Sequence, residues 1–203
     1  PSQYMWAGIG DTYAKYYEAL ISSRDERLEH FTAVGVAVSQ MCRDPLLLYS
    51  AQALEDHKQG LCTYAVEQVV LAIVVTTGIA SIFLTKDYTP DYNSGLAHAI
   101  FYALTAYPVI EERHLHGEVV AFGILIALLV DGQKEEFEKI YELNKSIGLP
   151  TRLSDIEITP AQWEECLDRI PTMSDVAHYP YKVTRPMLED AMKTLEERAV
   201  SHR

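Results

Sequence analysis

The longest apolar run in the chain, residues 69–84, limits the fold more than any other feature of the sequence. VVLAIVV alone would fit a buried strand, but it lies within a longer uninterrupted segment, which favours a helix. The run is short for a bilayer, contains Thr76, Thr77 and Ser81, and lacks a basic N-terminal flank. We therefore expect a helix buried in the core of a soluble protein.

Start and stop signals divide the rest of the chain into further helices. Thr159 to Gln162 has the form of a capping box with Pro160 at the first helical position, and Gly148 precedes a proline stop. The Gly8-Ile9-Gly10 segment is interpreted as a flexible turn before the first helix. Helices are expected over residues 11–22, 31–42, 45–56, 63–84, 96–105, 117–130, 134–147, 160–170 and from 184, with a loop over 85–95. This pattern predicts one all-α domain over residues 1–203, with at least seven helices.

Charge and cysteine usage exclude several classes of partner. Seventeen Lys and Arg against 29 Asp and Glu give a formal charge of −12, without the basic face needed to bind nucleic acid or anionic lipid. The three cysteines, Cys42, Cys62 and Cys166, form neither a disulfide framework nor a zinc-type pair. We expect a cytoplasmic protein with neither nucleic acid nor membrane as a partner.

Three histidines, His98, His114 and His116, lie close together in the sequence. On one straight helix His98 and His116 would be about 27 Å apart, too far to bind one ion. Tyr107-Pro108 supplies a break between them, so two helices meeting at a corner could direct both imidazoles to one point. Asp11 is a third candidate, although its place after a glycine turn also suits a helix cap, which the local pattern favours.

Three segments, GIGDTYAKYYEA, SGLAHAIFYALT and HLHGEVVAFGILIALLVDGQ, resemble signatures of the iron-containing (type III) alcohol dehydrogenases, most nearly the glycerol dehydrogenase branch. They occur in the same order, with the histidine interval of that branch. The resemblance implies that Asp11, His98 and His116 bind a divalent metal, either zinc or iron, and that hydride passes to NAD or NADP. It implies a small alcohol, polyol or hydroxy acid as the substrate.

The resemblance also bears on domain organisation. Enzymes of this type have an N-terminal α/β nucleotide-binding domain followed by an all-helical metal-binding domain of the dehydroquinate synthase-like fold. We expect the present chain to correspond to the second domain only, with the nucleotide-binding domain absent. The chain alone is then expected to be inactive, with a cleft beside the ligands, and to form a homo-oligomer through the helical halves.

The chain departs from the glycerol dehydrogenase pattern around His98. Phe101 replaces a second histidine of HAIHNGLT, and KDYTPDYNSG replaces a small, Gly-rich segment before the motif. His114 should point away from the site, to support it from behind or lie at the surface. Glu118 either orients a ligand or interacts with the helix dipole.

Three alternatives to alcohol oxidation remain. A 2-hydroxy acid or 2-oxo acid reductase would need a cation for the substrate carboxylate, and Arg113 is the nearest in sequence. A non-catalytic helical assembly domain would be expected to have lost a ligand. A metal phosphohydrolase of the His-Asp type is disfavoured, because the sequence has no His-Asp dipeptide.

Overall fold

The computed structural model describes residues 2–85 and 92–200, and every regular element in these ranges is helical. The all-α prediction is therefore confirmed, while most of the expected loop at 85–95 lies outside the described residues. The α-helices are α1 (Ser2–Ser22), α2 (His30–Ser39), α3 (Asp44–Lys58), α4 (Tyr64–Leu71), α5 (Thr77–Leu84), α6 (Leu96–Leu104), α7 (Pro108–Arg113), α8 (His116–Val130), α9 (Lys134–Ile147), α10 (Pro160–Cys166) and α11 (Arg185–Val200).

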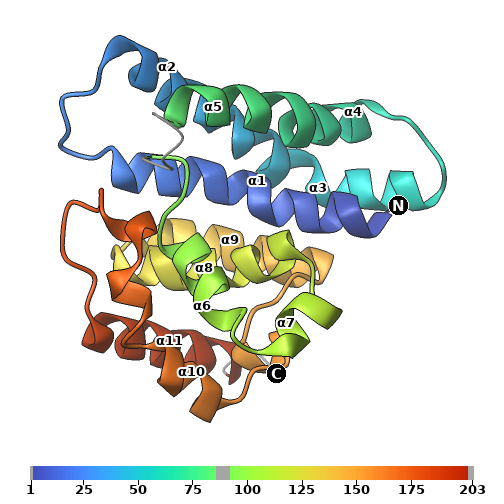
Figure 1. Cartoon of the computed structure of the whole chain (residues 1–203). Helices are drawn as coiled ribbons and strands as arrows, with labels where there is room; N and C mark the ends of the chain where they lie inside the picture. Colours follow the sequence, from blue (N-terminus) through green and yellow to red (C-terminus); the bar gives the residue numbers. More distant parts are fainter. Residues whose placement is uncertain (1, 86–91, 201–203) are drawn as a thin grey trace.

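Helix α8 is the centre of the structure. Its sequence HGEVVAFGILIALLV is apolar on all sides, which is typical of a helix surrounded by others, and residues from Val119 to Leu128 are all buried. Helices α1, α6, α9 and α11 pack against it. In Figure 1, α1 crosses the molecule with α2, α4 and α5 on one side and α6 to α11 on the other. The candidate site lies where α1, α6 and α8 meet.

The prediction of a turn at Gly8-Ile9-Gly10 is wrong, because α1 begins at Ser2 and continues through these three residues as a regular helix. These glycines permit close packing rather than a change of direction. A Cβ on Gly10 would lie 2.8 Å from the Cβ of Ala121 on α8 and nearer still to a backbone carbonyl. Asp11 is consequently in the interior of α1, so its interpretation as a helix cap is also wrong.

The apolar run forms the expected helix, but it is not buried. Thr63 caps α4 by accepting a hydrogen bond from the Val66 amide at 3.4 Å, and the helix continues through a π-helical turn, Ala72–Thr76, into α5. The whole segment Tyr64–Leu84 is long and apolar enough by composition to cross a bilayer. Only 22% of its most apolar 18-residue stretch is buried inside the protein.

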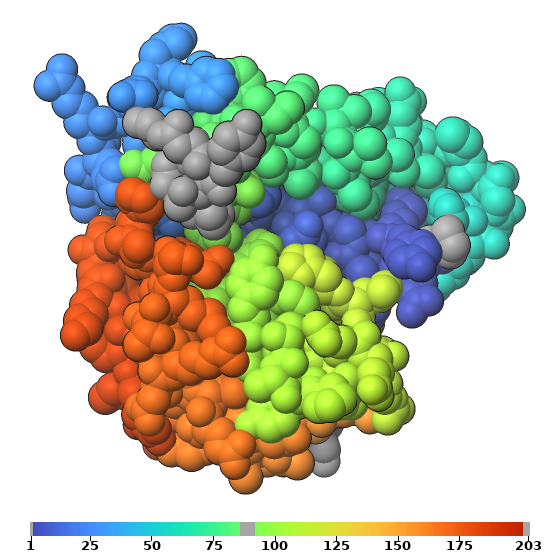
Figure 2. All heavy atoms as spheres, viewed as in Figure 1, coloured from blue at the N-terminus to red at the C-terminus, as the bar shows by residue number. Residues whose placement is uncertain are grey.

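One side of this segment packs on α2 and α3, and the other faces outward. We call the outward residues the apolar face: Val70, Leu71, Val74, Val75, Ile79 and Ile82. In Figure 2 the segment forms part of the outer surface, coloured teal to green. The apolar run therefore correctly predicted a helix, but the prediction that this helix is buried is wrong.

Two predicted terminal signals are confirmed. The Thr159 hydroxyl accepts from the Gln162 amide at 3.3 Å, and the Gln162 side chain accepts from the Thr159 amide at 2.8 Å, which completes the capping box of α10. Gly148 ends α9 with a φ of 78°, a conformation that favours glycine. Helix α10 itself ends at Cys166, earlier than expected.

Candidate metal centre

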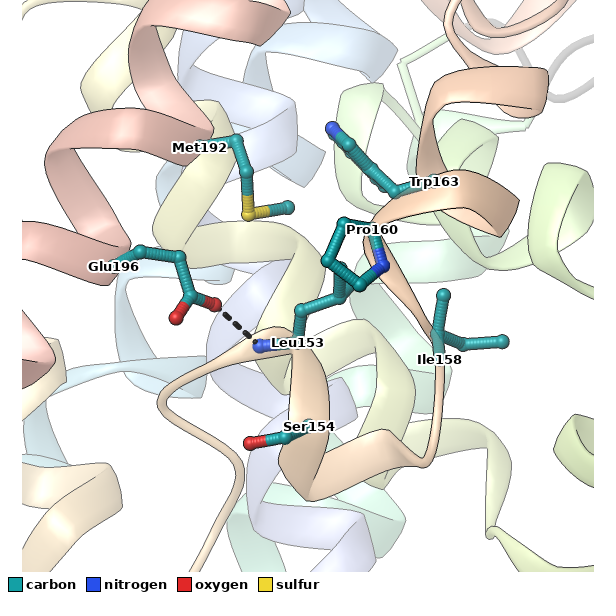
Figure 3. Close-up of a pocket in the computed structure, with 7 residues that line it drawn as sticks. All are labelled: Leu153, Ser154, Ile158, Pro160, Trp163, Met192 and Glu196. Atoms are coloured by element: carbon teal, nitrogen blue, oxygen red, sulfur yellow. Dashed lines mark hydrogen bonds between the residues drawn. The ribbon is translucent and has the colours of Figure 1, made fainter.

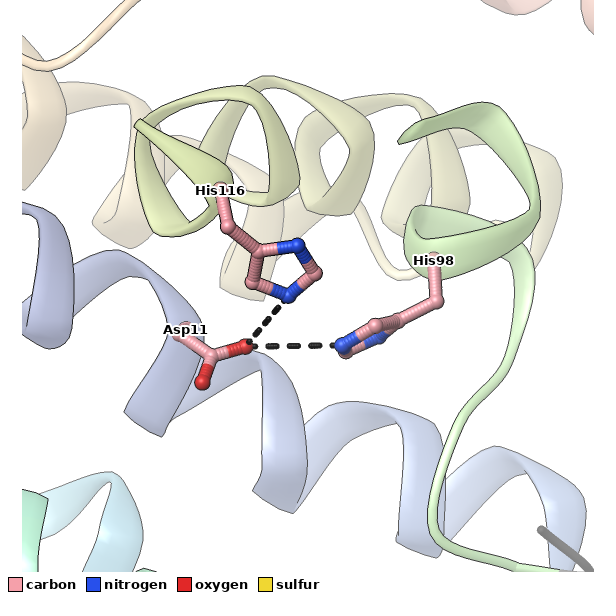
Figure 4. Close-up of side chains that lie close together, drawn as sticks. All are labelled: Asp11, His98 and His116. Atoms are coloured by element: carbon pink, nitrogen blue, oxygen red, sulfur yellow. Dashed lines mark ion pairs between the residues drawn. The ribbon is translucent and has the colours of Figure 1, made fainter. Parts of the chain in front are cut away.

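Close helix contacts at glycines bring Asp11, His98 and His116 together. A Cβ on Gly117 would lie 3.1 Å from the Asp11 Cβ and nearer still to the backbone of α1, so α8 meets α1 there in backbone contact. A Cβ on Gly123 would lie 2.7 Å from the Ala97 carbonyl oxygen, which places α6 equally close to α8. The residues next to these contacts therefore point into one space, as Figure 4 shows.

The three side chains converge on a single point, as predicted. Asp11 Oδ1 lies 3.4 Å from His98 Nε2 and 3.4 Å from His116 Nε2. One ligand atom from each of the three residues lies within 4.8 Å of the others. No other group of three metal-binding side chains is found in the described part of the chain.

These separations fit a small divalent ion. Ligands about 2.1 Å from a tetrahedral centre lie about 3.4 Å from one another, and two ligands on one ion are at most about 4.2 Å apart. The carboxylate-to-imidazole distances therefore need no change, and the widest pair would have to close by at most about 0.6 Å. Two imidazole nitrogens and a carboxylate oxygen form a donor set that suits zinc or iron.

The Asp11 carboxylate supplies a second indication of fit. Its Oδ1 is buried and has no hydrogen-bond partner, although the side chain as a whole is one-third exposed. The two imidazoles face this atom as ion-pair contacts, not as hydrogen bonds. Burial alone would raise the Asp11 pKa, but the facing rings of His116 and His98 hold it well below its ordinary value. A charged oxygen that accepts no hydrogen bond and lies between two imidazoles is an arrangement that a cation would satisfy.

His98 is held from behind by Glu18, which the sequence did not reveal as a site residue. Glu18 is fully buried, and its carboxylate contacts His98 Nδ1 at 2.6 Å. Burial disfavours the protonated ring, but Glu18 and Asp11 outweigh it and raise the pKa of His98 to about 10. The only available sequence signal was the position of Glu18 seven residues after Asp11, on the same side of one helix.

His116 begins α8 and is supported by its neighbours. The Phe101 ring meets its imidazole edge-on, with centroids 4.3 Å apart. Glu118 accepts hydrogen bonds from the Leu115 amide at 3.1 Å and from His114 Nδ1 at 2.8 Å. The His114 side chain is only 6% exposed, so it supports Glu118 rather than lying at the surface, and Glu118 anchors the helix end that carries His116.

A hollow of about 320 Å³ opens beside Asp11 and His116. It is lined by Tyr4, Ala7, Gly8, Asp11, Leu115, His116 and Gly117. His116 is 42% exposed and His98 only 9%, so a small molecule can approach the site from the His116 side. The expected cleft beside the ligands is present.

A second hollow, of about 230 Å³, lies between α10 and α11 and is drawn in Figure 3. Its lining is mainly apolar, with Trp163 and Met192 on facing elements. Its one acidic residue, Glu196, accepts a hydrogen bond from the Leu153 amide at 2.8 Å. Because none of the three converging side chains lines this hollow, it is separate from the candidate site.

Comparison with known proteins shows which fold and family these features belong to. A probable glycerol dehydrogenase from Sinorhizobium meliloti superimposes with a TM-score of 0.84 at 28% identity, covering 99% of this chain and 56% of that one. Glycerol dehydrogenase from Schizosaccharomyces pombe superimposes with a TM-score of 0.81 at 23% identity. The fold is that of the helical C-terminal part of glycerol dehydrogenase structures.

Sequence comparison agrees with the structural match. Hydroxycarboxylate dehydrogenase A from Escherichia coli is 33% identical over 201 residues, 97% of this chain and 54% of that protein. Glycerol dehydrogenase from Thermotoga maritima is 31% identical over 179 residues, 82% of this chain and 45% of that protein. No family model matches. The chain belongs to the iron-containing and glycerol dehydrogenase family, and it spans about half the length of the relatives it matches.

Proposed function

We propose that this chain is the metal-binding domain of a dehydrogenase that oxidises a small alcohol or polyol and passes hydride to NAD or NADP. Asp11, His98 and His116 bind the metal, zinc or iron. The observation that carries the proposal is the buried Asp11 Oδ1, which accepts no hydrogen bond and lies 3.4 Å from one nitrogen of each imidazole. Retention of all three ligands weighs against a domain kept only for assembly.

The chain's own residues would position the substrate. A bound divalent ion supplies Lewis acidity, which makes an alcohol hydroxyl easier to deprotonate. The hollow beside His116 admits the substrate, and the rigid crossing of α1 and α8 fixes Asp11 relative to His116. Phe101 restrains the exposed His116 ring from rotating.

Electrostatics favour a neutral substrate over a hydroxy acid. None of the residues that line the hollow is Lys or Arg. Arg113 pairs with Glu157 at 2.6 Å, and Lys15 donates to Asn93. A substrate carboxylate would therefore need a cation from another part of the enzyme. The names of the relatives cover both classes, with glycerol and hydroxycarboxylates among them.

We further propose that the chain self-associates in the cytoplasm as a homo-oligomer, with the apolar face as the contact surface. Glu67 is the only charged residue between Thr63 and Thr85, whereas the whole chain has a net charge of −12. Two copies that met elsewhere would bring like charges together, so this uncharged surface suits a second copy best. The apolar face runs about 18 Å along one helix, from Val70 to Ile82, and each of its side chains is at least 39% exposed.

Cobalt substitution tests the proposed catalytic role. The visible spectrum of Co²⁺ bound to the chain reports its ligands, so we expect saturation at one ion and a spectral change on adding glycerol. His116→Ala should abolish both, and Glu196→Gln, in the separate hollow, should alter neither. A response to lactate but not to glycerol would favour the hydroxy-acid alternative, and no saturable binding would refute the proposal.

A further inference from the structure

We infer that Glu18 is a positioning residue that sets the orientation of His98 for metal binding, an inference that rests on the proposed metal site. Glu18 lies two turns after Asp11 on α1 and has no exposed surface. Its Oε2 is 2.6 Å from His98 Nδ1, and its Oε1 accepts from the His98 backbone amide at 3.1 Å. Both oxygens of one carboxylate thus contact the same residue.

These two contacts determine which ring nitrogen faces the other ligands. An ionised carboxylate can only accept, so Nδ1 must carry a proton and donate it. The remaining nitrogen, Nε2, then points toward Asp11. Asp11 and Glu18 are about 10.5 Å apart along one rigid helix and hold the imidazole between them. A buried carboxylate behind a histidine ligand also increases the basicity of that ligand.

Glu18 acts on the backbone of α6 as well as on the ring. Gly95 precedes α6 and offers no side chain to cap it, so the first amides need acceptors from elsewhere. The Leu96 amide donates to the Tyr179 hydroxyl at 3.0 Å, and the His98 amide donates to Glu18. Both the helix end and the ring of His98 are therefore held by Glu18 from α1.

Glu18→Gln separates this role from simple packing. The glutamine side chain has nearly the same shape, but its amide offers one accepting oxygen and one donating nitrogen. His98 presents two donors to position 18, so one of them must face an NH₂ group. The ring would turn, or Nε2 would carry the proton in place of Nδ1, and either change deprives a metal of the Nε2 lone pair without emptying a cavity.

The test is Zn²⁺ affinity, measured by competition with a coloured chelator at one fixed pH. Asp56→Asn is the matched control, because Asp56 is also a buried carboxylate that accepts two side-chain hydrogen bonds, from Gln52 and Thr63. We expect Glu18→Gln to weaken binding by about 10–100-fold, and Asp56→Asn to change it less than about twofold even if its Tm falls. Circular dichroism checks that each variant is folded.

Glu18→Asp provides a second variant if the glutamine form does not fold. It keeps the charge but shortens the reach, so an intermediate loss of affinity is expected. Affinities of the folded variants within twofold of the wild type would overturn the role of Glu18 while leaving the metal site intact. No zinc binding by the wild-type chain would instead overturn the proposed function, and this inference with it.

Discussion

Gly10 of α1 and Gly117 of α8 meet backbone to backbone, with the Gly117 carbonyl in the space that a Gly10 side chain would occupy. Each glycine is adjacent in sequence to a candidate ligand, Asp11 or His116. The helix crossing therefore sets the separation of the two ligands. A side chain at either glycine would push apart the groups that have to converge.

Gly117→Ala should destabilise the fold by about 3 kcal/mol, because its Cβ would overlap the Ala7 backbone, which cannot move away as a flexible side chain can. Chemical denaturation measures the change. The matched control is Gly78→Ala, where an added Cβ meets nothing within 4 Å and should stabilise the helix by about 0.5–1 kcal/mol. Equal stability of the two variants would show that the crossing tolerates a side chain.

The same glycines explain where the sequence misled. Gly8-Ile9-Gly10 has the composition of a turn, and only the presence of α8 against Gly10 shows why glycine is required there inside a helix. Helix ends were easier to predict, because a cap such as Thr159 acts within its own few residues. The exposure of the apolar face depends on distant neighbours, so composition alone could not decide it.

Predictability of the site followed the same division. Asp11, His98 and His116 were predicted as ligands through family signatures. Spacing alone did not decide whether the two histidines bind one ion, and the local pattern at Asp11 favoured a helix cap. Glu18 gave only one weak signal, its position seven residues after Asp11, because a glutamate in a helix is ordinarily at the surface. Its burial arises from the contact of α1 with the start of α6, which is not a property of either segment alone.

The partly buried ion-pair cluster at Glu136 should make stability depend on acid pH. Burial alone would raise its pKa, but Lys139, Tyr17 and Arg43 together lower it from 4.5 to about 2. A carboxyl with a lowered folded-state pKa stabilises the protein above its unfolded pKa. This stabilisation should therefore be lost as the pH falls from about 4.5 to about 2.

Glu136→Gln tests this expectation. The substitution should lower the free energy of unfolding by about 2 kcal/mol at neutral pH. It should also flatten the dependence of that free energy on pH below about 4.5. Glu135→Gln, at the exposed neighbouring position, should do neither. Parallel pH profiles for the wild type and Glu136→Gln would contradict the assignment.

Self-association through the apolar face predicts a specific response to charge. Val74→Glu and Ile82→Glu, at positions 66% and 67% exposed, should not disturb the fold but should raise the dissociation constant at least about tenfold. Val200→Glu, equally exposed on α11, is the control. Sedimentation equilibrium measures the effect.

A monomeric wild-type chain at 100 µM would contradict this account. Tight binding of the wild type to phosphatidylcholine vesicles, without self-association, would also contradict it and would assign the apolar face to lipid. Because the measurement needs no metal, it is independent of the metal site.

The purified 203-residue chain should not oxidise glycerol with NAD, even when loaded with zinc. Hydride transfer requires the nicotinamide at near-attack distance. Gly8-Ile9-Gly10 lies inside α1 and does not form a phosphate-binding loop after a strand. NADH absorbance measures turnover, and a steady rate that depends on the concentration of this chain would refute the expectation.

Calorimetric titration with Zn²⁺ tests the central claim most directly. The wild-type chain should bind one ion, Asp11→Asn should bind at least about 100-fold more weakly, and Asp190→Asn, an exposed aspartate on α11, should match the wild type. Equal affinities of the Asp11→Asn variant and the wild type would contradict the assignment of Asp11, His98 and His116 as one metal site.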